Sequence, residues 1–351
     1  MTDVHMPGSQ LGELVRLNRR FGVLYAGGVP IFDALVVLQG EAQLPFAAAI
    51  GEIRVRMEQG AGMASAMAEY PHLFPPIYRE WVRQAEESGT LDIGAREAAE
   101  LLEPVALAGS EAALGWDRIE HAMTLIQFTR RCAELLERGL EWWRVLCLLT
   151  FEAPVTFARL IEDLLHRRDD QRQWLALWER MEEYPQTFSP FYRAMIRLGW
   201  ETRHFDETVH YLAELLYEDW RFAQLRHCFP DRPSLIIDLG QPQLVEWAAL
   251  TPTQADLITL LFFRALSMLL AAGHDQAEAL TVCANLLPQQ QQTDLLAALG
   301  DEDRSLADLL PFFSPFVHAL LRVGEQRGRS EYVCNQIAEV LRAEQHFTDS
   351  V

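Results

Sequence analysis

The chain has 351 residues, half of them apolar, which is enough for two or three globular domains and excludes a disordered chain. Its formal net charge of −20 and its pI near 4.9 argue against nucleic-acid binding and against docking on an anionic membrane, because both need clustered Lys and Arg. The same charge favours solubility and partner proteins that carry basic patches.

The first hundred residues show helical periodicity interrupted by Gly and Pro. In "LGELVRLNRRFGVLYAGG" the apolar residues from Leu11 to Leu24 fall mostly on one helical face. The segment "FAAAIGEIRVRMEQG" repeats the pattern and stops at Gly60. The only strand-like run of the chain is short, "RPSLIIDLGQP" at 232–242. The pattern therefore predicts an all-α fold.

Two apolar runs, 141–151 and 258–273, are candidates for membrane spans. Each contains an internal arginine, Arg144 or Arg264. Neither run offers the roughly 20 uninterrupted apolar residues that a spanning helix needs. We expect buried amphipathic helices and no membrane span.

Five cysteines stand singly along the chain, at Cys132, Cys147, Cys228, Cys283 and Cys334. The sequence has no CxxC pair, so neither a zinc ribbon nor a thioredoxin-type site is predicted. The odd number and the lack of a signal-peptide pattern predict reduced, buried thiols and a cytoplasmic location.

Three stretches of the chain share one layout. In each, a helix is predicted to end at a glycine with positive φ, after which the chain doubles back as a helix pair. These glycines are Gly28, which Pro30 follows, Gly139 and Gly273. Farther on, each stretch has a Phe-x-Pro motif, in which the Pro begins a helix and the Phe anchors it to the bundle. The phenylalanines are Phe74, Phe188 and Phe313.

This layout predicts three tandem helical bundles. The bundles are expected at 1–105, 125–216 and 258–346. A linker at 106–124, a second with short helices at 217–257, and a tail at 347–351 complete the chain. The motifs recur too far apart for a solenoid, whose repeats have about 20–50 residues. Each stretch is long enough for a small core of its own.

The first stretch resembles the F domain of the inner-membrane platform proteins of type II secretion and type IV pilus systems. The resemblance is carried by Gly28-Val29-Pro30, Gly60, Phe74-Pro75, and Glu86 with Ser88-Gly89. The second stretch departs from the motif, with Gly199 in place, Trp200 where the acid should stand, Glu201 one position late and Arg203 in place of the last Gly. The third stretch regains Gly324-Glu325 and Gly328.

The resemblance implies a helical docking module and protein partners. It points to a soluble, non-catalytic scaffold without cofactors, which binds a secretion or pilus assembly ATPase, pilus-type assembly components or other copies of itself. Family members usually carry two such cytoplasmic domains and membrane helices, whereas three domains and no spans are expected here. Two other classes stay open: a metal-dependent or other helical enzyme on this fold, and a regulatory adaptor of an unrelated machine.

The candidate partner-binding residues are Glu86, Glu87, Glu325, Trp200 and Glu201. Glu86 stands about one turn before Gly89, near a helix C-terminus, where an acid opposes the helix dipole. Three interpretations are open: a bond within the bundle to an arginine or to an N–H at a neighbouring helix start, a contact with another chain or a cation, and catalysis. The acidic run at 301–303 is interpreted as a helix cap or a solvated face, with a weak Ca²⁺ site as the alternative.

Overall fold

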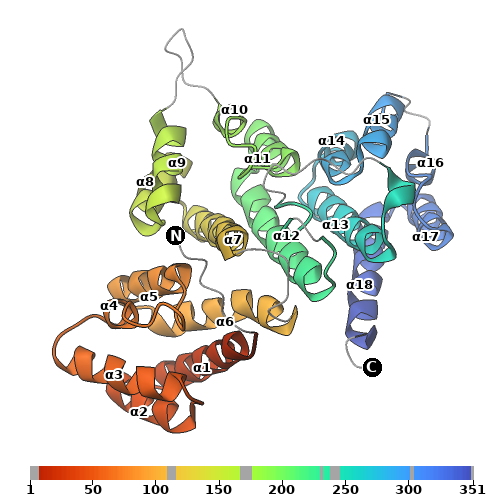
Figure 1. The fold of residues 1–351 in the computed structure, drawn as a ribbon. Helices are drawn as coiled ribbons and strands as arrows, with labels where there is room; N and C mark the ends of the chain where they lie inside the picture. Colours follow the sequence, from red (N-terminus) through yellow and green to blue (C-terminus); the bar gives the residue numbers. More distant parts are fainter. Residues whose placement is uncertain are drawn as a thin grey trace. The chain divides into compact units, whose positions relative to one another are not determined.

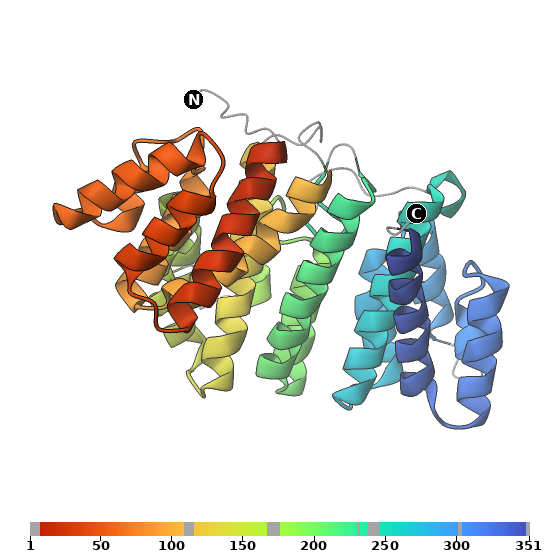
Figure 2. The ribbon, with the colours of Figure 1, turned by 90° about the horizontal axis from the view of Figure 1, so that it is seen from below.

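A computed structural model describes residues 8–108, 116–166, 176–229, 232–237, 246–300 and 304–348. Across these ranges every regular element is a helix and none is a strand, which confirms the predicted all-α class (Figures 1 and 2). The strand-like run forms bends over its described part, 232–237.

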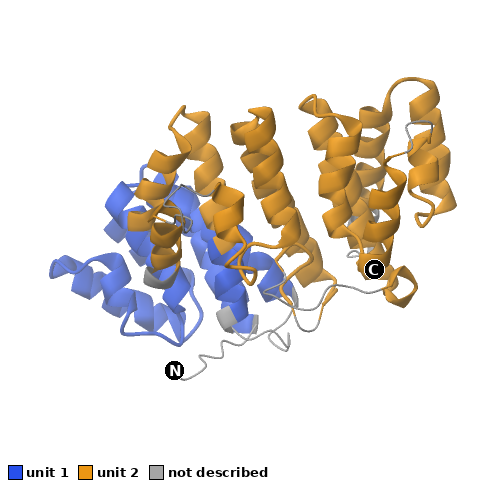
Figure 3. Ribbon diagram, turned by 90° about the horizontal axis from the view of Figure 1, so that it is seen from above, with its two compact units in different colours: residues 1–124 blue, residues 125–351 orange. Residues whose placement is uncertain are grey.

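The chain divides into two compact units, residues 1–124 and 125–351 (Figure 3). The division falls inside one helix, α7. The helices of the first unit are α1 (Gly8–Ala26), α2 (Ile31–Glu41), α3 (Phe46–Glu58), α4 (Met63–Met67), α5 (Pro76–Ser88) and α6 (Leu91–Ala108), followed by the start of α7 (Trp116–Glu137). The longest contact runs between α1 and α6, which lie side by side, while α5 packs on α6 and α2 packs on α1 and α3. Together these helices bury one apolar core, which includes Leu14, Ile53 and Trp81.

The second unit contains the rest of the chain. Its helices are α7, α8 (Trp142–Glu152), α9 (Val155–His166), α10 (Leu177–Met181), α11 (Pro190–Thr202), α12 (Phe205–Leu225), α13 (Pro252–Ala271), α14 (Gln276–Cys283), α15 (Gln289–Ala298), α16 (Leu306–Leu309), α17 (Pro315–Gln326) and α18 (Ser330–Thr348). Two short 3₁₀ helices, η1 (Trp247–Ala249) and η2 (Ala284–Leu286), complete it. Here α13 lies along α18, α12 packs on α13, and α11 packs on α14 and η2 (Figure 1).

The predicted linkers differ from the structure. Most of the described part of 106–124 is helical, because α6 ends at Ala108 and α7 begins at Trp116, where Ile119 and Met123 are buried. The stretch 217–257 likewise holds the end of α12, all of η1 and the start of α13. Because α11 and α12 pack directly on α13 and α14, the second and third predicted bundles fall in one compact unit.

Three turns have the same backbone. The turn glycines Gly28, Gly139 and Gly273 have φ of 83°, 81° and 84°, a region that side-chain-bearing residues rarely adopt. The amide of each glycine, and that of the residue after it, donates to carbonyls of the helix that ends there. A new helix begins three residues on in each case, at Ile31, Trp142 and Gln276. Pro30 is the residue before the first of these helices. We call α2, α8 and α14 the post-glycine helices.

Three further helices also share their geometry. Phe74, Phe188 and Phe313 are all buried, and each is followed by a helix that begins with proline. We call these the corner helices: α5, α11 and α17. A residue with positive φ follows each of them: Gly89 (70°) and Arg203 (65°) come directly after α5 and α11, and Gly328 (61°) stands two residues after the end of α17. Arg203 therefore adopts the left-handed backbone conformation, which a residue with a long side chain does not favour.

The apolar run at 258–273 belongs to a longer helix than the sequence suggested. Helix α13 begins at Pro252 and has 20 residues, so by length and composition it could cross a membrane. It is the only such helix in the described residues, and 61% of its apolar window is buried inside the fold. Core helices of soluble proteins pass the same test, so this single helix is weak evidence for a span.

Candidate functional site

Glu86 caps a neighbouring helix. Its carboxylate lies in the last turn of α5 and accepts hydrogen bonds from the backbone amides of Met63 (2.5 Å) and Ala64 (3.1 Å). These are the first two residues of α4, whose amides have no partner within that helix. Gly62 lets the carboxylate approach, since a Cβ there would lie 3.3 Å from a Glu86 oxygen. An acid that is unfavourable at the end of its own helix is thus stabilised at the positive end of another.

Glu325 has the same role in the second unit. It lies in the last turn of α17, at the position of Glu86 in α5, and accepts a hydrogen bond from the backbone amide of Leu306. Leu306 is the first residue of α16, the short helix before that corner helix. Ser305 completes the cap, because its hydroxyl accepts a bond from the amide of Asp308 (3.1 Å).

Trp200 occupies the equivalent position in α11 and does something different. Its ring packs against Trp142, Trp178 and Phe205, with centroids 5.3, 6.1 and 5.7 Å away. The short helix α10 obtains its acid locally, because the amide of Ala176 donates to Glu179 (2.9 Å). The second corner therefore replaces a capping carboxylate by an aromatic cluster.

Glu87 and Glu201 take no part in these caps. Glu87 is exposed and bonded to Arg83 (2.6 Å), and Glu201 is paired with Arg197 (2.9 Å). Arg83 also bonds Glu80, and this bond raises the pKa of its guanidinium. Arg83, Glu86 and Glu87 line an open cleft between α4 and α5. The cleft offers both signs of charge on its rim, which suits contact with a charged protein surface.

A close helix crossing recurs beside each corner. Each corner helix crosses the helix that follows it, and at the crossing one residue of each helix faces the other. In all three crossings one of these two residues is glycine. The three pairs are Ala85 with Gly94, Gly199 with Thr208, and Gly324 with Val333. A Cβ added to the glycine would lie 2.7, 2.7 or 2.9 Å from a side-chain atom of its partner. Gly199 and Gly324, which the sequence placed in a motif, thus serve packing and stay helical.

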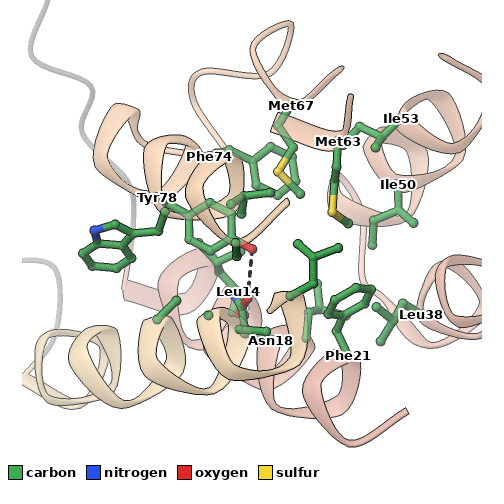
Figure 4. A pocket seen from close by; sticks show the side chains of 18 of the residues that line it. Leu14, Asn18, Phe21, Leu38, Ile50, Ile53, Met63, Met67, Phe74 and Tyr78 are labelled. Atoms are coloured by element: carbon green, nitrogen blue, oxygen red, sulfur yellow. Dashed lines mark hydrogen bonds between the residues drawn. The ribbon is translucent and has the colours of Figure 1, made fainter. Parts of the chain in front are cut away.

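A small apolar cavity of about 50 Å³ lies in the core of the first unit (Figure 4). Its one hydrogen-bonded polar pair joins the hydroxyl of Tyr78 to the side-chain oxygen of Asn18 (2.9 Å). Burial raises the pKa of Tyr78 to about 12, so the hydroxyl stays protonated. The equivalent corner residue Tyr192 bonds Thr129 (3.0 Å). The pair orients α5 against α1.

Asp219 is a fully buried carboxylate that the sequence did not single out. It accepts bonds from the amides of Leu235 (2.8 Å) and Ile236 (2.6 Å), and so holds the bend at 232–237 against α12. Burial raises its pKa to about 6, although these bonds and Arg232 oppose the shift. Asp219 stands next to Glu218 and two residues before Arg221, a charged stretch that gives no sign in the sequence of a buried carboxylate.

Metal-binding groups and reactive thiols are the remaining kinds of site to consider in the described parts of the chain. No three His, Cys, Asp or Glu side chains there could hold a metal ion together. The acidic run at 301–303 lies outside the described residues. The pKa of four thiols is raised by burial, which keeps them protonated: Cys132, Cys228, Cys283 and Cys334. Cys147 is half-buried.

The bundle that carries Glu86 matches a known protein family. Residues 18–112 match the family of type II secretion system protein F. This range contains the first turn glycine, the first corner and Glu86. The match supports, over this stretch, the predicted likeness to platform proteins of secretion and pilus systems.

Individual relatives agree. The chain is 41% identical over 88 residues to the type 4 fimbrial assembly protein PilC of Pseudomonas putida, which covers 24% of this chain and 22% of that protein. It is 30% identical over 91 residues to the type IV pilus assembly protein PilC of Thermus thermophilus, covering 26% and 22%. It is 24% identical over 86 residues to the type II secretion system protein F of Vibrio cholerae, covering 24% and 21%. The chain therefore spans about a fifth of the length of these relatives.

Proposed function

We propose that this chain is a non-catalytic scaffold that binds protein components of a secretion or pilus-type assembly machine, an assembly ATPase first among them. The observation that carries the proposal is the match of residues 18–112 to type II secretion system protein F. Two of the similar proteins are named as pilus assembly proteins, so assembly partners are the natural candidates.

We further propose that the chain contains three copies of this domain, at 1–105, 125–216 and 258–346. Support comes from the three turn glycines, the three corner helices and the three close crossings, which recur in the same order. The third copy keeps the capping acid, while the second has exchanged it for Trp200.

The use of the motif acids favours a scaffold over an enzyme. Glu86 and Glu325 are occupied by backbone amides, which gives them a structural task. The cleft beside Glu86 has a charged rim, and the net charge of −20 complements a basic partner surface. We place the protein in the cytoplasm, where assembly ATPases work, and cell fractionation tests that location.

The test is binding of the purified chain to the assembly ATPase of its own organism, measured by isothermal titration. We expect a stoichiometric complex that Glu87→Lys weakens at least tenfold, because this change reverses the charge on the exposed rim of the cleft. Gln326→Lys is the matched control, since it adds the same side chain at the equivalent position of α17. Failure of the unchanged protein to bind the ATPase or any pilus-type component would overturn the proposal.

A further inference from the structure

The second unit contains an internal interface that shows how these bundles pack on each other. The corner helix α11 lies against the post-glycine helix α14 and against η2 (Figure 1). On α11, Phe191, Met195 and Leu198 share one face and are all buried. On α14, Val282 is buried, with only 5% of its surface exposed.

The corner helix α17 leaves the same apolar face partly exposed. Its residues at the positions of Phe191 and Leu198 are Phe316 and Val323. Phe316 is 50% exposed, whereas Phe191 is 1% exposed. Val323 is exposed as well, and Leu320 between them is half-buried. Exposed apolar side chains gathered on one helix face mark an interaction surface.

The post-glycine helix α2 also exposes apolar side chains. Val37 stands at the position of Val282 and is 42% exposed. Phe32 and Val36 are exposed beside it. At Val37 the helix thus presents to solvent a position that α14 buries, whereas the equivalents of Phe32 and Val36 in α14, Ala277 and Thr281, are exposed as well.

The charges next to these faces also match. Arg322 on α17 repeats Arg197 on α11, and Asp33 on α2 repeats the acid Glu278 on α14. The remaining post-glycine helix, α8, also exposes apolar residues, among them Leu148, but it has Arg144 at that position. Electrostatic complementarity therefore selects α2 over α8 as the surface for α17.

We propose that α17 of one molecule docks on α2 of a second copy of this chain, and so repeats the α11–α14 packing between molecules. Two different surfaces meet, so the association is head to tail and builds rings or chains of molecules. The inference rests on packing within the second unit and holds whether or not the chain binds an assembly ATPase.

Light scattering across a concentration series up to about 100 µM tests the interface. The unchanged chain should grow in mass with concentration. Val37→Glu removes one surface and Val323→Glu removes the other, so each variant alone should stay at 40.1 kDa. An equimolar mixture of the two keeps one intact pair of surfaces, and its mass should double and go no further.

Leu148→Glu is the matched control, because it places the same charge at the equivalent position of α8, and it should assemble like the unchanged chain. Circular dichroism verifies that each variant is folded, and Val37→Asn replaces Val37→Glu if that variant is not. The proposal is wrong if the unchanged chain stays monomeric throughout, if the mixture of variants stays monomeric, or if Leu148→Glu abolishes assembly.

Discussion

The corner at residues 63–89 and the corner at 177–203 have the same order of elements: a short helix, a buried phenylalanine and a corner helix. Different side chains hold these elements together in the two corners. In the first, Glu86 reaches back from the corner helix α5 and caps the short helix α4. In the second, Trp200 takes that position in α11 and packs with Trp142 and Trp178, while Glu179 of α10 accepts a bond from the amide of Ala176, the residue before that helix. The two corners share their backbone conformation, whereas the side chains that stabilise it differ, a carboxylate in the first and an aromatic ring in the second.

The comparison explains why a sequence motif can decay while its structure persists. The positive φ at the end of the corner helix is kept even where Arg203 replaces glycine. Such a residue costs conformational energy, which the packing around α11 must offset. Loss of a motif residue therefore indicates a change of local chemistry more safely than a loss of fold.

The largest expected effect comes from making the second corner resemble the first. Trp200→Glu should lower the free energy of unfolding by about 3 kcal/mol, because it removes the ring contacts with Trp142, Trp178 and Phe205. Urea denaturation measures the change. A Trp200→Glu protein as stable as the unchanged chain would mean that the two corners are interchangeable after all.

The close crossings give the next largest effect. Gly94→Ala should destabilise the protein by about 2 kcal/mol, because the new Cβ would lie 2.7 Å from that of Ala85. Exchanging the pair, with Ala85→Gly added to Gly94→Ala, reproduces the order found at Gly199 and Thr208. The double variant should regain most of the lost stability in thermal unfolding. If it is no better than Gly94→Ala, the crossing is not a two-residue contact.

Removal of the capping acid should have a moderate effect. Glu86→Ala leaves the amides of Met63 and Ala64 to water, and we expect a loss of about 1 kcal/mol in urea denaturation. Glu87→Ala is the control, since this neighbour forms an exposed ion pair with Arg83, and its effect should be near zero. Equal effects of the two changes would contradict the cap.

The smallest effect is a pH dependence of stability, which we expect from Asp219 in the second unit. Burial raises the pKa of Asp219 to about 6, so its neutral form is favoured by folding. That stabilisation is complete below the unfolded pKa and is lost as the pH rises through about 6. Between pH 5 and 7 the free energy of unfolding should fall by about 1 kcal/mol from this residue. Asp219→Asn should lack this part of the slope, which unfolding at several pH values would show.

Much of the fold could be predicted from local chemistry. Turn glycines, prolines that begin helices and helical periodicity act over a few residues, and they fix the all-α class and the three corner helices. Phe74, Phe188 and Phe313 could be assigned to the core because each precedes such a proline. The likeness to secretion system protein F could also be seen from these motifs.

The rest depended on contacts between distant residues. The two amides that Glu86 binds, those of Met63 and Ala64, stand 23 and 22 residues earlier in the chain. No local sequence pattern links Glu86 to these two residues. Gly94 is needed only because α6 crosses α5 at that point. The burial of Asp219, and the packing of α11 on α14 that joins the second and third predicted bundles, are likewise decided by tertiary structure.

Amide hydrogen exchange at the start of α4 tests most directly that the motif acid is a helix cap. The amides of Met63 and Ala64 have no acceptor within α4, so their protection depends on Glu86. In Glu86→Ala we expect these two amides to exchange at least tenfold faster, while amides in α1 and α6 keep their rates. Unchanged exchange at Met63 and Ala64 would contradict the account. It would favour the alternative interpretation, in which Glu86 binds a partner protein.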